Sequence, residues 1–293
     1  MNTAPVREGI CALVASFRPG AGFESHCREL LAQFRFLVVV DDGSPCSPLP
    51  TASPLHSVPG FRMVYHAHNR GLAAALNSGL EAARELGCSW VVLLDQDTVP
   101  YPNLLQGLLD TWHQCPGPRI IVGANYWNSH RARTYLRRKT GAPPIPRKTL
   151  ITAGTLLPIA ITDEIGNFRE DYVIDSVDHE FSMRARRAGW RLFMTSAVLC
   201  HQSIGGDGRR QNPLASFDHS PLRKYYIARN TVFTAGLYAR GEPAWALRQV
   251  WRLCGDLVSL LFFERERGRR LRAFLGGLRD GLAGRLGPTS RTW

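Results

Sequence analysis

The stretch Trp90-Val91-Val92-Leu93-Leu94-Asp95-Gln96-Asp97 decides the fold of this chain. An apolar run that ends abruptly in two acids is typical of a buried parallel strand whose carboxylates emerge at the carboxyl edge of a sheet. Open α/β sheets bind their ligands at that edge. Two carboxylates one residue apart can hold a divalent cation there, because hard cations prefer oxygen ligands. For this motif taken alone, a solvated strand end remains the alternative.

Strand and helix signals alternate through the first hundred residues. Apolar runs predict strands, and apolar residues at helical spacing predict helices. The expected strands are 10–15, 36–40, 61–65 and 90–94, and the expected helices are 23–33 and 71–86. This alternation predicts an α/β fold with a mostly parallel central sheet.

Three later segments differ from this pattern. Residues 124–149 are rich in Arg, Lys, Pro and Asn, which predicts a long basic loop. Residues 175–188 predict a helix that Gly189 ends. From Trp245 onward, apolar residues at helical spacing and then a run of arginines predict a basic amphipathic helical extension.

Composition narrows the class of partner. The formal net charge of +12 favours an acidic partner, such as nucleic acid, an anionic membrane surface or a phosphorylated ligand. The basic residues concentrate in one loop and the tail, without an aromatic-basic module, so we expect no nucleic-acid binding. Seven cysteines without a C-x-x-C pair favour a reducing compartment. With no signal-peptide pattern and no run of roughly 20 apolar residues, we expect a cytoplasmic protein.

A second acidic strand end precedes the Asp-Gln-Asp motif. Asp41 and Asp42 follow the expected strand 36–40, so they would face the same crevice as Asp95 and Asp97. They are well placed to accept hydrogen bonds from a nucleobase or a ribose, while the later pair would hold a metal diphosphate.

The helix expected over 71–86 opens with small residues next to Asn69 and Gly71. A helix N-terminus carries partial positive charge, and small residues let its backbone approach an anion. Packing of the helix against the sheet explains the same small residues equally well.

Together these motifs resemble the inverting family 2 glycosyltransferases of GT-A fold, in matching order over roughly residues 10–235. The Asp-Gln-Asp variant is similar to the bacterial rhamnosyltransferase branch. One departure is Ser16-Phe17-Arg18-Pro19, where relatives usually have a Thr-Tyr-Asn-Pro type of loop. The other segments that carry the resemblance are Val38-Val39-Val40-Asp41-Asp42-Gly43-Ser44, Asn69-Arg70-Gly71, Leu93-Leu94-Asp95-Gln96-Asp97, Thr152-Ala153-Gly154-Thr155, Ile174-Asp175-Ser176-Val177-Asp178-His179-Glu180, His201-Gln202-Ser203-Ile204-Gly205 and Arg223-Lys224-Tyr225-Tyr226 with Arg229-Asn230.

The resemblance implies a nucleotide-sugar donor and a divalent metal, Mg²⁺ or Mn²⁺. The implied donor-binding residues are Asp41, Asp42, Asn69, Gly71 and Asp95. The implied metal ligands are Asp95, Asp97 and His201. For His201, a purely structural role is the open alternative.

The resemblance also implies that Asp178 is the base that deprotonates the acceptor hydroxyl. A capping role for Asp178 at the start of its helix is the alternative. Glu180 would orient the acceptor or pair with Arg184 one turn later. Arg229 would close over the donor phosphates or dock its helix beneath the site.

The resemblance divides the chain into a GT-A domain over 1–235 and a helical extension over 236–293. The domain would have a nucleotide-binding half over about 1–123 and an acceptor half over about 150–235. We expect transfer of L-rhamnose from dTDP-L-rhamnose to a cell-surface glycan or a lipid-linked acceptor. Galactofuranose, a UDP-linked hexose, or an inert glycan-binding or membrane-docking relative are the alternatives. The basic extension would lie on an anionic membrane surface, on the inner face of the cell membrane, or pack on the domain with a solvated charged face.

Overall fold

The computed structural model describes residues 4–128, 132–139, 141–202, 219–264 and 266–293. The chain forms two compact units, which are described separately. The first holds Met1–Phe168 and Phe181–Ser203, and the second holds Arg169–Glu180 and Ile204–Trp293. The domain boundary expected at residue 235 lies inside helix α6 of the second unit.

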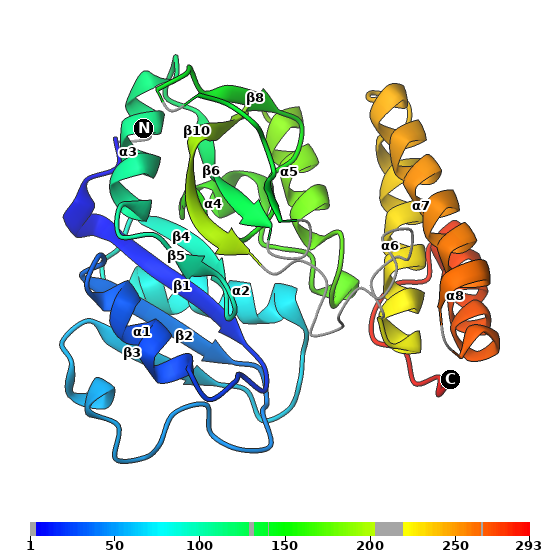
Figure 1. The fold of residues 1–293 in the computed structure, drawn as a ribbon, viewed down its shortest axis with the longest axis horizontal. Coiled ribbons are helices and arrows are strands. Elements are labelled where there is room, and N and C mark those ends of the chain that lie inside the picture. The colour runs from blue at the N-terminus through cyan, green and yellow to red at the C-terminus, as the bar shows by residue number, and fades with distance from the viewer. Residues whose placement is uncertain (1–3, 129–131, 140, 203–218, 265) are drawn as a thin grey trace. The chain divides into compact units, whose positions relative to one another are not determined.

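The first unit is built on one twisted sheet in the order β3-β2-β1-β4-β9-β6-β10-β5 (Figure 1). Neighbouring strands are parallel from β3 to β4, while β9 runs antiparallel between β4 and β6. The strands of this path are β1 (Ile10–Ser16), β2 (Phe36–Asp41), β3 (Phe61–Tyr65), β4 (Trp90–Asp95), β5 (Val99–Pro100), β6 (Ile120–Asn128), β9 (Thr155–Pro158) and β10 (Arg191–Gln202). The predicted α/β fold with a mostly parallel sheet is confirmed.

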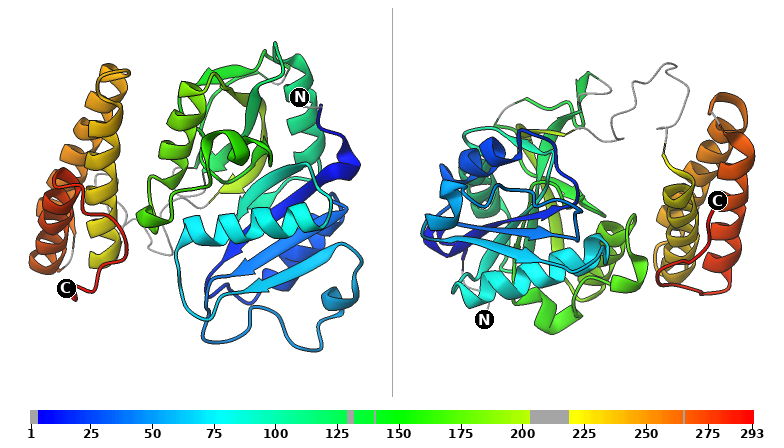
Figure 2. Two further views of the ribbon diagram at one scale, coloured as in Figure 1. Left: turned by 180° about the vertical axis from the view of Figure 1, so that it is seen from behind. Right: turned by 90° about the horizontal axis from the view of Figure 1, so that it is seen from below.

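Helices cover both faces of this sheet. The helix α1 lies in front of the sheet in Figure 1, and α2 lies in front when the molecule is seen from behind in Figure 2. The small residues of α2 pack it closely on the sheet, because a Cβ at Gly79 would collide with the Leu13 side chain of β1. The helices of this unit are α1 (Phe23–Leu31), α2 (Leu72–Glu85), α3 (Leu104–Gln114), α4 (Ile161–Ile165) and the later turns of α5 (Val177–Arg187).

The segment expected as a long basic loop contains more regular structure than predicted. Strand β6 runs to Asn128, and two short strands follow it, β7 (Arg133–Thr134) and β8 (Ile145–Arg147). Strand β7 pairs with β6 and β8 pairs with β10. The prediction of one long loop is wrong because strand partners distant in sequence, rather than local propensity, define these short strands.

In the second unit, three helices pack together: α6 (Pro221–Tyr238), α7 (Pro243–Phe263) and α8 (Arg267–Leu282). Ala228, Leu253, Leu260 and Phe274 form their shared core. The carboxylate of Glu264 lies buried at the α7–α8 junction, 2.5 Å from the Lys224 ammonium and 3.2 Å from the Arg270 guanidinium. The predicted helical extension is confirmed, although part of its Arg-rich run is buried rather than solvated. In the described parts of the chain, no helix is both long and apolar enough to cross a bilayer.

Candidate functional site

The acidic strand ends lie at one edge of the sheet. Strand β1 is hydrogen-bonded to β2 on one side and to β4 on the other, and Ser16 is in register with Asp41 while Ala15 is in register with Asp95. Because these three strands are parallel, both acidic ends emerge at the carboxyl edge. The ends of β2 and β4 therefore lie at the same edge of the sheet, one on each side of β1.

The carboxylate of Asp42 is buried and already accepts several hydrogen bonds. The backbone amides of Arg70 and Gly71 donate to it over 2.8 Å each, and the His66 ring Nδ1 lies 2.7 Å from it. Gly71 has φ of +95°, which permits this approach at the start of α2. Asp42 thus ties the end of β2 to the loop before α2. Its predicted contact with the nucleoside stays a prediction.

Gly43 is the residue that allows this loop to approach. Its φ is +75°, and a Cβ there would lie 2.6 Å from the backbone nitrogen of Asn69. A side chain at this position would push the loop around Asn69 away from the sheet edge. The exposed Asn69, predicted to bind donor, is therefore held at the edge by backbone packing.

Asp41 connects β2 to the loop that follows β1. The Ser44 hydroxyl donates to its carboxylate over 2.5 Å, and the same hydroxyl accepts a hydrogen bond from the Arg18 amide over 2.7 Å. Arg18 itself has a left-handed φ of +50°. Arg18, where the loop departs from the usual sequence, is thus connected to the first acidic strand end through Ser44.

The Asp95 carboxylate is oriented by side chains from two other segments. The Thr152 hydroxyl donates to one oxygen over 3.1 Å, and the Gln202 amide donates to the other over 2.9 Å. The Gln202 carbonyl in turn accepts from the Thr98 hydroxyl over 2.6 Å. Strand β10 and the loop before β9 therefore converge on the end of β4.

The middle residue of the Asp-Gln-Asp motif fixes the turn. The Gln96 side-chain carbonyl accepts from the Phe17 amide over 2.7 Å, which links this turn to the loop after β1. Asp97 is exposed, whereas Asp95 is half-buried. Asp95 is thus oriented by Thr152 and Gln202, while Asp97 is the more exposed acid of the motif.

His201 lies on a different side of its strand from Gln202. Its ring is 5.3 Å from the Tyr101 ring and 6.4 Å from the Trp127 ring, measured between centroids. Successive side chains of a strand point to opposite faces, and Gln202 is the one that contacts Asp95. Within the described residues, no three His, Cys, Asp or Glu side chains gather closely enough to hold a metal. Metal binding by His201 stays a prediction.

Cys200 is a buried thiol near this strand end. Burial, and then the negative charge of Asp95, raise the pKa of its thiol to about 12. The thiol is therefore neutral at pH 7, and it is neither a nucleophile nor a thiolate ligand in this state.

Asp178 lies in the first turn of α5, in the part of that helix that belongs to the second unit. It is half-buried, and its carboxylate accepts from the adjacent His179 amide over 2.8 Å. The backbone just before it is unusual, because Val173, Asp175 and Ser176 all have φ between +61° and +65°. Left-handed conformations of non-glycine residues are costly and concentrate at functional sites.

Asn230 and Arg229 of α6 hold this strained segment. The buried Asn230 amide donates to the carbonyls of Tyr172, Ile174 and Asp175, over 2.7 to 3.0 Å. The buried Arg229 guanidinium donates to the carbonyls of Asp171 and Tyr172 and stacks over the Tyr226 ring. Arg229 thus docks its helix on the loop before Asp178, which is the second of the two roles considered from sequence. Direct contact of Arg229 with donor phosphates stays a prediction.

Glu180 and Asp175 are the other acids of this segment. Glu180 is buried, and the Tyr238 hydroxyl donates to its carboxylate over 3.2 Å. Its predicted contact with the acceptor stays a prediction. Arg184, its expected partner, donates to the carbonyls of Ile165, Gly166 and Asn167. The Asp175 carboxylate pairs with Arg223 at 3.2 Å, but burial outweighs this pairing and raises the pKa of Asp175.

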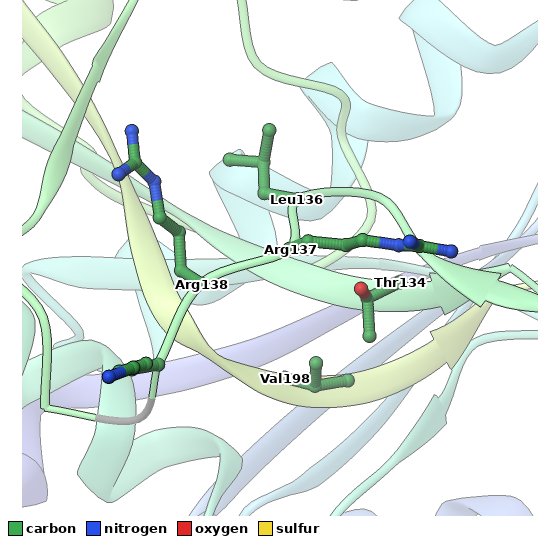
Figure 3. A pocket seen from close by; sticks show the side chains of 6 residues that line it. Thr134, Leu136, Arg137, Arg138 and Val198 are labelled. Carbon is green, nitrogen blue, oxygen red and sulfur yellow. The ribbon is translucent and has the colours of Figure 1, made fainter.

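A basic hollow of about 400 Å³ lies near β7 and β10 (Figure 3). Its two arginines, Arg137 and Arg138, point apart, so they do not form a shared anion site. The hollow is lined by Thr134, Leu136, Arg137, Arg138, Lys139 and Val198.

Residues 28–188, more than half of the chain, match the family model described as glycosyl transferase family 2. The chain belongs to glycosyltransferase family 2. The glycosyltransferase is 22% identical over 237 residues to the dTDP-rhamnosyl transferase RfbF of Shigella flexneri, covering 77% of this chain and 79% of that relative. It is 27% identical over 272 residues to the pre-mycofactocin glycosyltransferase of Mycobacterium tuberculosis, covering 81% of this chain but only 53% of that longer relative.

Solved structures show the same fold. The TarS 1–349 crystal structure from S. aureus superposes with a TM-score of 0.62 at 14% identity, covering 94% of this glycosyltransferase and 81% of that chain. The mannosyltransferase PcManGT from Pyrobaculum calidifontis, in complex with GDP-Man and Mn²⁺, superposes with a TM-score of 0.59, also at 14% identity, covering 94% and 88%. At these identities the likeness establishes the GT-A fold alone.

Proposed function

We propose that this glycosyltransferase transfers L-rhamnose from dTDP-L-rhamnose, with inversion, to a cell-surface glycan or a lipid-linked acceptor. The proposed choice of donor rests on the similarity to the Shigella dTDP-rhamnosyl transferase over more than three quarters of both chains. The Asp-Gln-Asp form of the motif at the end of β4 supports the same donor.

Asp95 and Asp97 are the proposed metal ligands. Their carboxylates fit Mg²⁺ or Mn²⁺, since Mg²⁺ is often bound by one or two carboxylates together with substrate phosphates and water. When bound, the cation would neutralise charge on the leaving nucleoside diphosphate. Thr152 and Gln202 would keep the Asp95 carboxylate oriented toward the edge of the sheet. His201 is the proposed third ligand.

Asp178 is the proposed base. Its position in the first turn of α5 stabilises an ionised carboxylate through the helix dipole, which suits a group that must accept a proton. Asp41, Asp42, Asn69 and Gly71 form the proposed nucleoside side of the site. In that role Asp42 would act partly by holding the loop around Asn69.

The donor is tested by turnover. The purified protein is incubated with Mn²⁺ and, separately, dTDP-L-rhamnose, UDP-galactofuranose or UDP-glucose, and release of the nucleoside diphosphate is measured with and without candidate glycan acceptors. We expect release from dTDP-L-rhamnose, at least about 100-fold slower in Asp178→Asn, with donor binding retained. Preference for a UDP-sugar would overturn the proposal that dTDP-L-rhamnose is the donor, but it would leave the family assignment unchanged.

A further inference from the structure

The helix α7 exposes an apolar face along most of its length. Trp251 is 76% exposed, Leu247 is 70% exposed and Phe262 is 65% exposed. Their spacing places them on one side of the helix, because residues at i, i+4, i+7 and i+11 share a face. This α7 outer face consists of Leu247, Val250, Trp251, Val258, Leu261 and Phe262.

The opposite side of α7 is already used. Leu253 and Leu260 are buried in the core shared with α6 and α8. A helix that is apolar on both sides is normally buried on both sides. The apolar side chains of the α7 outer face are nevertheless exposed to solvent. Large exposed apolar patches mark interaction surfaces.

Basic side chains border this face. Arg248 and Arg252 are exposed on α7, each directly after a residue of the α7 outer face. Helix α8 has an exposed side of its own on which cations and apolar side chains alternate, formed by Arg272, Leu275, Arg279 and Leu282. The whole chain carries a net charge of +12. A partner that complements such a surface has an apolar interior and an anionic outer layer.

A second copy of the chain fits this face less well. Arg248 and Arg252 are exposed beside this face, so two copies packed face to face would bring like charges together. An anionic bilayer offers the opposite charge, and a single convex ridge can enter the boundary between headgroups and acyl chains.

We propose that the α7 outer face docks on an anionic lipid bilayer, lying in the plane of the membrane. Trp251 and Phe262 enter the headgroup boundary, where aromatic rings are favoured. Arg248 and Arg252 contact anionic headgroups, whose surface potential attracts them. Membrane docking does not depend on which nucleotide sugar is the donor. A negative result in a vesicle-binding experiment would therefore not bear on the proposed donor.

Vesicle flotation with the full chain tests this. Vesicles of phosphatidylcholine alone and of phosphatidylcholine with phosphatidylglycerol are compared for wild type and for Trp251→Ser/Phe262→Ser. We expect wild type to float with the anionic vesicles only, and the double variant to bind at least about tenfold more weakly. Val6→Ser/Tyr65→Ser, which removes exposed apolar side chains from the first unit, is the matched control and should bind as wild type.

A second variant tests the charge. Arg248→Gln/Arg252→Gln should weaken binding to the anionic vesicles, and added salt should weaken the binding of wild type in the same way. A circular dichroism melt confirms that each variant folds. The proposal is overturned if the folded Trp251→Ser/Phe262→Ser variant floats like wild type. It is also overturned if the wild-type protein does not bind the anionic vesicles and instead forms a dimer, while the Trp251→Ser/Phe262→Ser variant is monomeric.

Discussion

Asp42 directly follows β2 and Asp95 ends β4, the two strands that flank β1. The hydrogen-bond donors around these two carboxylates are of different kinds. Asp42 accepts from backbone amides, so its charge is used to hold a loop. Asp95 accepts from the side chains of Thr152 and Gln202, and it remains half-exposed. Both acids could be singled out from sequence as strand ends. Their hydrogen-bond partners could not, because Gln202 lies 107 residues from Asp95 in the sequence.

Replacing Gln202 tests whether it orients a metal ligand. In Gln202→Leu the Asp95 carboxylate loses one donor, and we expect Mn²⁺ affinity to fall about 10-fold, the lower end for outer partners of metal ligands. Mn²⁺ titration followed by electron paramagnetic resonance measures this, with the exposed Gln106→Leu of α3 as the control. Unchanged Mn²⁺ affinity in a folded Gln202→Leu protein would contradict the orienting role.

Asp175 links protonation to stability. Burial raises its pKa above the usual 3.8 despite the nearby Arg223, so the folded state binds this proton more tightly than the unfolded chain. Its contribution to the free energy of unfolding therefore falls as pH rises from 3.8 toward the folded-state pKa. We expect Asp175→Asn to gain stability relative to wild type across that range. Denaturant unfolding of both proteins from pH 3.5 to pH 7 measures this, and a constant difference would refute it.

At the scale of elements, local pattern predicted several of those observed, although α3 and β6 were not among the expected elements. Strand β3 was predicted at its observed bounds, and α2 within a residue of its own. Strands β7 and β8 were missed because each is only two or three residues long and exists through pairing with a distant strand. The left-handed residues before α5 could not be foreseen either. Val173 is β-branched and disfavours that conformation, so contacts with α6 must impose it.

Asn230 is the residue that most directly restrains that segment. Asn230→Ala removes a buried amide that donates to three carbonyls, and we expect a loss of about 2–3 kcal/mol in the free energy of unfolding. Urea unfolding measures the loss, with the half-buried Thr231→Ala on the same helix as a control. A loss below that of Thr231→Ala would show that the segment does not need Asn230.

At the scale of the whole molecule, a GT-A unit and a helical unit are joined in one chain. The fold and the family were predicted from motifs in order along the sequence, and both are confirmed. The choice of donor sugar is set by a few contacts in the binding pocket, which the motifs do not define. The solved relatives are only 14% identical, so their pocket residues do not identify these contacts. The proposed chemistry requires that Asp95 and Asp97 hold a cation that binds the diphosphate of the donor.

Isothermal titration of dTDP-L-rhamnose tests this claim most directly. Wild type, Asp97→Asn and Asp110→Asn are each titrated with Mn²⁺ and again with a chelator. Asp110 is an exposed acid on α3 and serves as the matched control. We predict binding by wild type and Asp110→Asn with Mn²⁺ only, and a loss of at least about 10-fold in Asp97→Asn. Equal binding by all three proteins, or binding that survives the chelator, would contradict the metal site.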